Sequence, residues 1–434
     1  MALMIKEVSI REGDILRVTG PARIEVLSGS ILAVGAAYGK GSSIVIHRFR
    51  SYGVKAIRNS KLRVTLGSDG VLEGPVERCE EVIDEWLSIV ENIYKDSLDR
   101  GVLVAVLGPI ESGKTTFTAF LANYFVQRGR RVAIVDADIG QEDVAIPTTI
   151  ALTEPNKPFI WQRELRPTDI RFAGCISPQY CQTALLAAIL DLIRVARERG
   201  YDGIVVNTDG WISSHQAIIY KINLIRWVRP THVVILGRDI GEVLLRALPK
   251  GVRVYIAPRP LKVRERARED RRRLRAEAYA RYFANARVRE VKLSDVKLIN
   301  SVVLLGKRLE GRELEELAND PLLKTLLDNS LYVSLLNKVL NVVVKEGVGD
   351  LVMGRTQSYS INVVRPSDVK GLVVGVLDER MNDVAAGVVE GIDFSKGVIK
   401  VRTPWDGGIG ALVLGDVKLL RNYEDSRRSA KCLV

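Results

Sequence analysis

The sequence GPIESGKT at residues 108–115 decides the fold. It follows the apolar run VLVAVL at 102–107 and precedes TTFTAFLANYFVQ at 115–127, which is typical of a helix. A strand, a glycine-rich loop of the pattern GxxxxGK followed by Ser or Thr, and a helix predict a phosphate-binding loop. In such a loop, successive backbone N–H groups and the positive end of the helix face the phosphate oxygens. The alternative is a glycine-rich turn that matches by chance, and the second motif downstream argues against it.

The residue types in this loop indicate its chemistry. Lys114 is expected to neutralise the β- and γ-phosphates, and the hydroxyl of Thr115 is expected to ligate Mg²⁺. The other predicted nucleotide-binding residues lie in the loop and in the first turn of the helix: Gly108, Glu111, Ser112, Gly113 and Thr116. The loop therefore predicts a nucleoside triphosphate and Mg²⁺.

A second motif, DADIGQ at 136–141, follows the apolar strand predicted at 131–135. Carboxylates at the C-terminal end of a parallel strand lie at the edge where such sheets bind ligands. One of Asp136 and Asp138 can hold Mg²⁺ through water, and the other can accept a proton from an attacking hydroxyl. The alternative is a surface turn in which the aspartates cap a helix.

Two further segments bear on the site. NTDGW at 207–211 follows the apolar strand predicted at 203–206. Its Trp211 either stacks on a nucleobase, which is worth ~1–3 kcal/mol per base, or covers the edge of the sheet. FAGCISP at 172–178 precedes a predicted helix, and its Ser177 and Pro178 also suit an ordinary helix start. Neither segment by itself identifies the acceptor of the phosphate.

The stretch KVRERAREDRRRLR at 262–275 contains eight basic and three acidic residues, so it holds much of the chain's positive charge. One interpretation is a solvated helix face with charge pairs three or four residues apart. The other is an arginine-bearing lid that closes on the triphosphate and stabilises the transferring phosphoryl group.

The composition excludes several classes of protein. The 434 residues carry 64 Lys and Arg against 52 Asp and Glu, a formal net charge of +12, with 47% apolar and 27% charged residues. Such a chain is typical of soluble globular proteins. No apolar run approaches the roughly 18–20 residues that cross a bilayer, and no signal peptide is recognisable, so a cytoplasmic protein without membrane contact is expected. The four cysteines form no CxxC pair, so neither a zinc site nor a disulfide framework is expected.

The order of predicted elements gives the fold class. Residues 1–96 predict a β-rich domain with a linker helix, because short Val- and Ile-rich segments precede a helical pattern at 82–93. Residues 97–288 predict an α/β P-loop core, in which a mostly parallel sheet carries helices on both faces. Residues 289–434 predict a smaller mixed, β-rich domain with a helical segment at 312–344.

The combination resembles the polynucleotide 5′-hydroxyl kinases related to the kinase subunit of eukaryotic mRNA 3′-end cleavage and tRNA-splicing complexes, with an archaeal-type member fitting best. The resemblance rests on the phosphate loop, the DADIGQ and NTDGW motifs and the basic stretch, in that order. It implies a P-loop kinase that transfers the γ-phosphate of ATP to the 5′-hydroxyl of RNA. It also implies single-stranded DNA as a second acceptor and RNA-processing proteins as partners.

The resemblance also implies roles for single residues. Asp138 would be the base that accepts the proton of the 5′-hydroxyl. Asp136 and Gln141 would organise the metal, water and the γ-phosphate. Ser177 would contact the phosphate of the acceptor end, and Trp211 would stack on its terminal base.

In the basic stretch, Arg266 and Arg271 would be the lid arginines at the transferring phosphate. The family also uses its N-terminal domain against the nucleobase, and Arg50 is the candidate for that contact. Two other functions compete with a kinase. A non-catalytic ATP-binding scaffold of an RNA-processing complex would not need Asp138 and Trp211. A P-loop GTPase-like protein or a metal chaperone would carry an NKxD motif or a CxxC pair, which this sequence lacks.

Overall fold

The computed structural model describes residues 3–77, 80–261, 267–347, 356 and 358–427. Its chain forms two compact units. Unit 1 comprises Met1–Ala145, Ile150–Asp169 and Ser177–Arg271, and unit 2 comprises Ile146–Thr149, Ile170–Ile176 and Arg272–Val434. The architecture is multi-domain α/β, as expected, and the domain boundaries after residues 96 and 288 stay predictions.

Unit 1 begins with a seven-stranded antiparallel sheet built on two long strands, β3 (Ala22–Ala33) and β6 (Ser51–Leu66). Side chains of β6 alternate between buried and exposed over most of its length, as expected for a strand with one face in a core. The other strands are β1 (Met4–Ile10), β2 (Ile15–Thr19), β4 (Ala36–Gly39), β5 (Ser43–Ile46) and β7 (Val71–Val76). β3 continues through a glycine. Gly29 has a φ of +79° and lies in a bulge of the β3–β6 ladder, so it bends the strand without ending it.

The linker helix α1 (Ile83–Asp99) joins this sheet to the P-loop core. Its buried residues belong to one hydrophobic cluster that includes side chains of both sheets. Trp86 lies edge-on to Phe117, with 5.3 Å between the ring centroids, and its indole N–H donates to the carbonyl of Pro258 at 2.9 Å. One side chain of α1 therefore contacts both the helix after the P-loop and the end of the last core strand.

The core sheet of unit 1 has the strand order β10-β9-β12-β8-β13-β14. Its strands are β8 (Val102–Leu107), β9 (Val132–Ala137), β10 (Thr149–Thr153), β12 (Gly203–Thr208), β13 (His232–Leu236) and β14 (Arg253–Ala257). All are parallel except β10, which is antiparallel to β9. Every residue of β8, β9 and β12 is buried, which explains their continuous apolar sequences. In β11 (Asp169–Phe172) the chain passes from unit 1 to unit 2.

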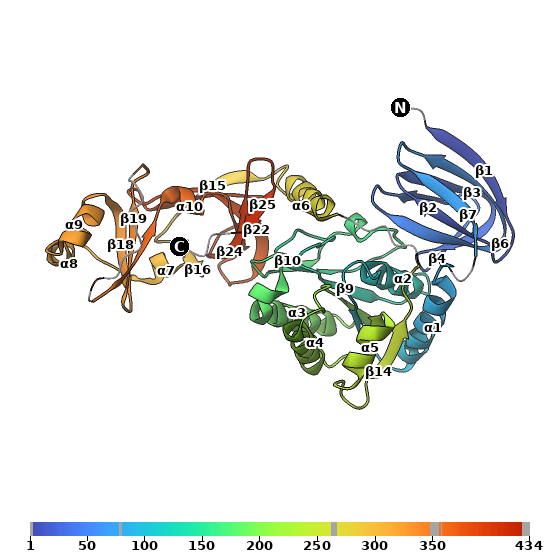
Figure 1. Ribbon diagram of the computed structural model, residues 1–434. Coiled ribbons are helices and arrows are strands. Elements are labelled where there is room, and N and C mark those ends of the chain that lie inside the picture. The colour runs from blue at the N-terminus through green and yellow to red at the C-terminus, as the bar shows by residue number, and fades with distance from the viewer. Residues whose placement is uncertain (1–2, 78–79, 262–266, 348–355, 357, 428–434) are drawn as a thin grey trace. The chain divides into compact units, whose positions relative to one another are not determined.

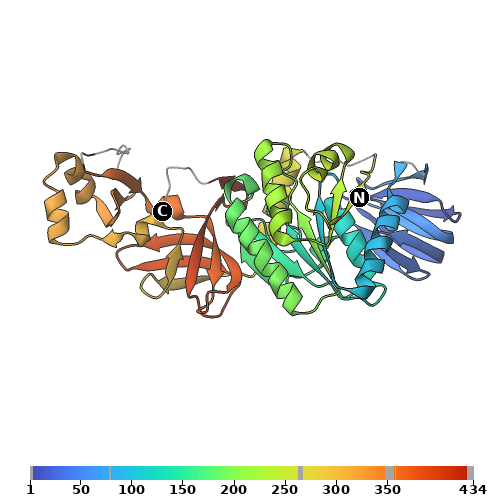
Figure 2. The same cartoon turned by 90° about the horizontal axis from the view of Figure 1, so that it is seen from below.

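Helices cover both faces of the core sheet (Figures 1 and 2). The helices are α2 (Lys114–Val126), α3 (Gln182–Glu198), α4 (His215–Val228) and α5 (Arg238–Leu245). Figure 2 shows α1 and α2 on one face and α3 and α4 on the other, and each pair is in contact. No helix in the described part of the chain is long and apolar enough to span a membrane.

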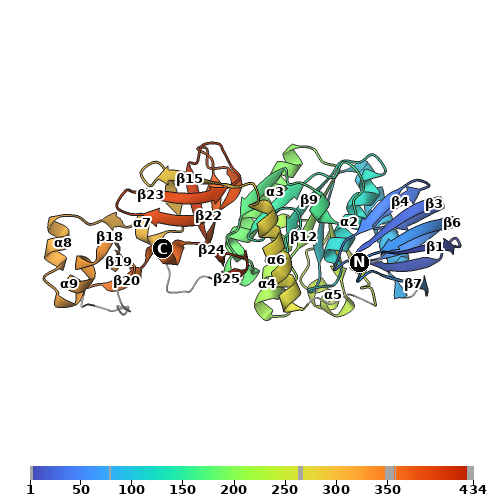
Figure 3. The ribbon, with the colours of Figure 1, turned by 90° about the horizontal axis from the view of Figure 1, so that it is seen from above.

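Unit 2 contains two further sheets and short helices, several of which are labelled in Figure 3. The larger sheet has the order β15-β23-β22-β21-β24-β16 with β25 beside β24, and the smaller has the order β17-β18-β19-β20. Its strands are β15 (Arg287–Lys292), β16 (Lys297–Ile299), β17 (Lys307–Arg308), β18 (Ser330–Leu336), β19 (Val339–Val344), β20 (Ser360–Val364), β21 (Leu372–Leu377), β22 (Asp383–Asp393), β23 (Val398–Thr403), β24 (Ala411–Leu419) and β25 (Asp425–Arg427). Its helices are α7 (Val302–Leu305), α8 (Arg312–Leu317), α9 (Pro321–Asp328) and α10 (Pro366–Val369), and α6 (Arg268–Tyr282) enters the unit at Arg272.

The helical segment predicted at 312–344 is wrong in its second half. Helices α8 and α9 end at Asp328, and the chain then forms the antiparallel pair β18 and β19. Asn337, with a φ of +55°, lies in the turn between these strands. Apolar runs of six or seven residues fit a buried helix or a strand equally well by periodicity, and here the Val-rich composition was the better indicator.

The expectation of no disulfide framework is wrong for the two cysteines of the described residues, because Cys175 and Cys181 are both disulfide-bonded. Spacing along the chain does not reveal which Cβ atoms come within bonding distance, so no sequence pattern indicated disulfide bonding here.

The position of Trp86 leads to a stability prediction. Trp86 is only 3% exposed, so Trp86→Ala should lower the free energy of unfolding by about 3–5 kcal/mol through the cavity it leaves. Leu98, in the same helix, is 55% exposed, and Leu98→Ala should change that free energy by less than about 0.5 kcal/mol. Denaturant unfolding followed by circular dichroism would measure both. Equal effects of the two variants would contradict the packing described for α1.

Candidate active site

The P-loop joins β8 to α2, as the sequence predicted. Gly108 has a φ of +154° and Gly113 a φ of +95°, and a Cβ at Gly108 would lie 2.6 Å from the Ser112 hydroxyl. A side chain at Gly108 would therefore fill the inside of the loop. The Ser112 hydroxyl is buried without a hydrogen-bond partner among the described residues. An open concavity with an unpaired donor suits a bound phosphate.

Lys114 begins α2 and is 6% exposed. Its Nζ donates to the Pro109 carbonyl at 2.8 Å, so the ammonium lies over the loop. Burial lowers the pKa of Lys114 to about 8, against the opposing effect of the Asp138 carboxylate. Thr115 and Thr116 follow in the first turn of α2 and are half-buried.

The predicted metal ligands come together through a residue to which the sequence assigned no role. Asn207, at the end of β12, donates from Nδ2 to Asp136 Oδ1 at 2.9 Å and to the Thr115 hydroxyl at 3.3 Å. Asp136 is fully buried, and its pKa is raised to about 7, first by burial and then by the charge of Asp138. A hydroxyl and a carboxylate are oxygen ligands of the kind that Mg²⁺ prefers.

The acidic side chains of the described residues also limit how the protein could hold a metal. The described residues contain no group of three or more His, Cys, Asp or Glu side chains that could hold a metal ion by themselves. A Mg²⁺ ion at Thr115 and Asp136 would therefore take most of its ligands from phosphates and water, which is its usual behaviour in nucleotide sites.

Asp138 lies one residue beyond β9 and is half-buried. Burial raises its pKa, whereas the charge of Lys114 lowers it. The backbone N–H of Gln141 donates to the Asp138 carbonyl at 2.9 Å, so the predicted Gln141 lies in a tight turn next to Asp138. The carboxylate and the P-loop lysine therefore interact, as the two motifs suggested.

The NTDGW motif contacts the P-loop directly. A Cβ at Gly210 would lie 2.7–2.8 Å from atoms of Ile110, so only glycine lets the two loops approach this closely. Asp209 is 3% exposed and pairs with the fully buried Lys221 of α4 at 2.7 Å. Trp211 is half-buried, and its ring lies 6.0 Å from that of Tyr220. Trp211 therefore lies beside the P-loop. The sequence alone did not establish this position.

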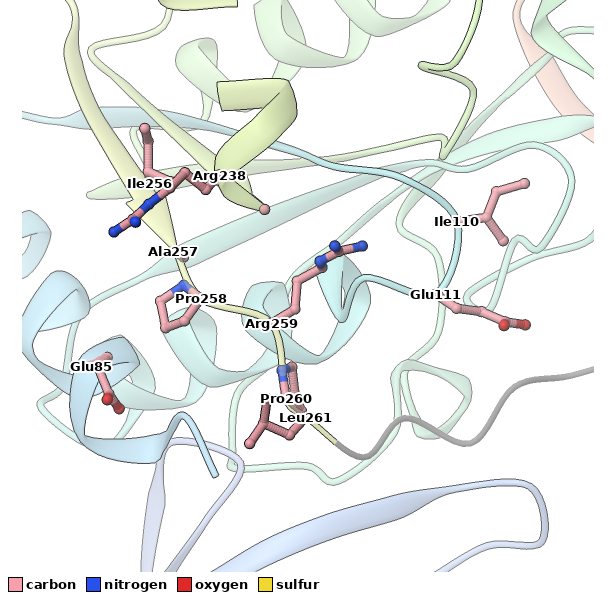
Figure 4. Close-up of a pocket in the computed structure, with 11 residues that line it drawn as sticks. Glu85, Ile110, Glu111, Arg238, Ile256, Ala257, Pro258, Arg259, Pro260 and Leu261 are labelled. Carbon is pink, nitrogen blue, oxygen red and sulfur yellow. The ribbon is translucent and has the colours of Figure 1, made fainter. Parts of the chain in front are cut away.

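A pocket of about 930 Å³ opens next to the P-loop (Figure 4). Ile110 and Glu111 of the P-loop form one wall, and the segment after β14, from Pro258 to Leu261, forms another. Arg259 extends across the pocket toward the P-loop side, and Glu85 of α1 lies at the opposite end (Figure 4). The pocket is large enough for a nucleoside.

Only part of the predicted lid can be placed. Arg271 of α6 lies 3.5 Å from Glu111 of the P-loop, and its role at the transferring phosphate stays a prediction. Arg266 lies outside the described residues. Arg275 pairs with Asp425 within unit 2 at 2.9 Å and has a structural partner. The basic stretch therefore places one arginine next to the P-loop and another in an ion pair within unit 2.

Ser177 lies at the start of the 3-10 turn η3 (Pro178–Tyr180), with Pro178 in the first position. This is the helix-start geometry that the sequence offered as the simpler interpretation. Its side chain makes no capping hydrogen bond. No described contact joins Ser177 to the P-loop or to Asp138, so its role as an acceptor ligand stays a prediction.

The suggested base contact of Arg50 is wrong. Arg50 is 9% exposed, and its guanidinium bonds to Asp143 Oδ2 at 2.5 Å and lies 4.5 Å from the centre of the Trp161 ring. The N–H of Asp143 in turn donates to Asp136 Oδ2 at 3.3 Å. Arg50 therefore supports the carboxylate of the predicted metal site, because a buried guanidinium is most stable next to a buried carboxylate. Arg50 and Asp143 are 93 residues apart, so no local sequence pattern indicates that they pair.

Comparison with known proteins agrees with this geometry. The family model of the P-loop of the mRNA cleavage and polyadenylation factor CLP1 matches residues 108–285. A polyribonucleotide 5′-hydroxyl-kinase of Methanocaldococcus jannaschii is 29% identical over 316 residues, which are 71% of this chain and 83% of that protein. A polyribonucleotide 5′-hydroxyl-kinase Clp1 of Gallus gallus is 31% identical over 243 residues, covering 50% of this chain and 56% of that protein. Over residues 108–285 the chain is therefore similar to the CLP1 family, and over most of its length it is similar to polyribonucleotide 5′-hydroxyl-kinases.

The fold of this Clp1-like chain extends beyond the matched segment. The solved structure of a wild-type Clp1p–Pcf11p complex has a TM-score of 0.63 at 12% identity, and the match covers 96% of this chain and 98% of that chain. The P-loop, the DADIGQ and NTDGW motifs and Arg271 all lie within the segment 108–285.

The lowered pKa of Lys114 leads to a prediction for nucleotide affinity. In the free protein, Lys114 is mostly charged below its pKa of about 8 and mostly neutral above it. At higher pH, binding of a triphosphate therefore requires Lys114 to take up a proton. The Kd for ATP should therefore rise by roughly 20-fold between pH 7.5 and 9.5. Calorimetric titration would measure this, and Lys114→Arg, which keeps its charge, should show a flatter profile. A flat profile in the original protein would contradict the lowered pKa.

Proposed function

We propose that this chain transfers the γ-phosphate of ATP to the 5′-hydroxyl of RNA. The observation that carries the proposal is the direct contact of a nucleotide loop with a second loop that bears Trp211. Nucleotide binding or hydrolysis needs only the first loop, whereas transfer to a polynucleotide needs both. The two relatives described above carry the name of this activity, which supports the proposal.

The nucleotide would lie across the P-loop. Lys114 and the loop N–H groups would hold the β- and γ-phosphates, and the pocket between the P-loop and residues 258–261 would take the nucleoside. When bound between Thr115 and Asp136, Mg²⁺ would neutralise charge on the phosphate oxygens. Arg271, held next to Glu111, would stabilise the charge of the transferring group from the lid side.

Asp138 would act as the general base. The 5′-oxygen attacks the γ-phosphorus, the bond from that phosphorus to the β-γ bridging oxygen breaks, ADP leaves, and the hydroxyl proton passes to Asp138. Burial raises the pKa of this carboxyl, which makes its ionised form a stronger base, while the charge of Lys114 acts against that rise.

The acceptor would approach from the side of the NTDGW motif. Trp211 offers a half-buried ring next to the P-loop, on which the terminal base would stack. Gln141 and Ser177 would contact the γ-phosphate and the acceptor phosphate, respectively. Because stacking is not selective for the sugar, single-stranded DNA would serve as a second acceptor.

Phosphate transfer tests the proposal directly. The purified chain with Mg²⁺ and γ-labelled ATP should label a 5′-hydroxyl RNA oligonucleotide, and less efficiently a DNA oligonucleotide, but not a 5′-phosphorylated RNA. Asp138→Asn should lower kcat by about 10²–10⁴-fold and leave the Kd for ATP within twofold, because only proton transfer is lost. ATP binding without any labelled RNA would favour the scaffold, and release of inorganic phosphate alone would favour a nucleotide hydrolase.

The stacking role of Trp211 can be tested separately. Trp211→Ala should raise the KM for a 5′-hydroxyl RNA by about tenfold or more, corresponding to ~1–3 kcal/mol, without changing the KM for ATP. Trp227, which is 57% exposed at the end of α4, provides the matched control, and Trp227→Ala should leave both KM values unchanged. An unchanged acceptor KM in Trp211→Ala would remove the assignment.

A further inference from the structure

A second buried lysine lies behind the loop that carries Trp211. Lys221 of α4 is fully buried, and its Nζ donates to Asp209 Oδ2 at 2.7 Å and to the Asp209 carbonyl at 3.0 Å. Asp209 itself is 3% exposed. Neither side chain contacts the nucleotide or the acceptor in the phosphate-transfer scheme above, although both charges influence the pKa of Asp138. A buried ion pair of this kind is weak evidence for stability, because removing two charges from water costs several kcal/mol, so another reason for its presence is required.

The pair fixes the backbone of the loop on both sides of Gly210. While Asp209 Oδ2 and the Asp209 carbonyl accept from Lys221, Asp209 Oδ1 accepts the backbone N–H of Trp211 at 2.9 Å. The intervening Gly210 packs directly on Ile110 of the P-loop. The backbone at Trp211 is therefore tied to α4 through Asp209 and to the P-loop through Gly210.

Tyr220, which precedes Lys221 in α4, lies next to the ring of Trp211. The Tyr220 ring lies 6.0 Å from that of Trp211 with 31° between their planes, and Lys221 Nζ lies 4.9 Å from the centre of the Tyr220 ring. Consecutive residues of α4 therefore hold the backbone and the ring of Trp211.

We propose that Asp209 and Lys221 are positioning residues for the acceptor: their ion pair holds Trp211 at the distance from the P-loop that brings a stacked 5′ end to Asp138. The inference rests on the proposed function, since it needs a polynucleotide on Trp211. It assigns a role in acceptor binding and none in nucleotide binding.

A double-mutant cycle distinguishes positioning from general stability. Lys221→Met removes the charge at similar length, and it should raise the KM for a 5′-hydroxyl RNA by about fivefold or more while the KM for ATP stays within twofold. In a Trp211→Ala background, Lys221→Met should cause no further rise, because its effect acts through Trp211. Lys221→Arg, which can keep the ion pair, should recover at least half of the loss in acceptor affinity.

Controls separate this effect from misfolding. Arg17 of β2 is 4% exposed and pairs with Glu81. Arg17→Met therefore removes a buried cation that is distant in sequence from Trp211, and this variant should leave the KM for the acceptor unchanged. If Lys221→Met does not fold, Asp209→Asn, which keeps the shape of the side chain, decides the question through the same cycle. Additive effects with Trp211→Ala, an unchanged acceptor KM, or a parallel rise in the KM for ATP would overturn the inference.

A binding assay tests the positioning role independently of the proposed kinase activity. Anisotropy of a 3′-labelled 5′-hydroxyl RNA measures acceptor binding without turnover, and the same cycle can be run on its Kd. Binding that weakens in Lys221→Met only when Trp211 is present would support the positioning role even if no phosphate were transferred. Binding that is indifferent to Lys221 would overturn the positioning role even if the chain were an active kinase.

Discussion

The register of β12 between β8 and β9 is the constraint on which the site depends. β12 is parallel to both neighbours and pairs Asn207 with Asp136 on one side and with Val106 on the other. The three strands therefore end at the same level, and the loops after them open at one edge of the sheet. A shift of β12 by one residue would turn Asn207 to the other face of the sheet and remove its bonds to Thr115 and Asp136.

Burial of charge at this edge gives the residues their chemical properties. Removal from water raises the pKa of Asp136 to about 7 and lowers that of Lys114 to about 8, so both side chains titrate near neutral pH. Such groups are stable only because opposite charges or N–H donors lie next to them. One of these supports comes from Arg50, directly before β6, which binds Asp143, and the N–H of Asp143 binds Asp136. The carboxylate that would hold Mg²⁺ thus depends in part on the N-terminal region of the chain.

Prediction from sequence succeeded where the signal was local and failed where it was not. The strands and helices around the P-loop lie within a few residues of their predicted positions, because continuous apolar strands and helical periodicity are local patterns. The helix predicted across 330–344 is wrong because short apolar runs do not distinguish a helix from a strand. The base contact suggested for Arg50 is wrong because a buried arginine and an exposed one look the same in sequence.

By itself the sequence determined the chemistry of the P-loop, the two aspartates at the end of β9 and the resemblance to a family, since each depends on residues adjacent in the chain. Only the tertiary structure decided which charges meet. Lys221 reaches Asp209 from 12 residues away, and Arg50 reaches Asp143 from 93 residues away. The physical reason is that a buried ion pair is formed by the packing of separate elements, and no local pattern of residue types records which elements will pack together.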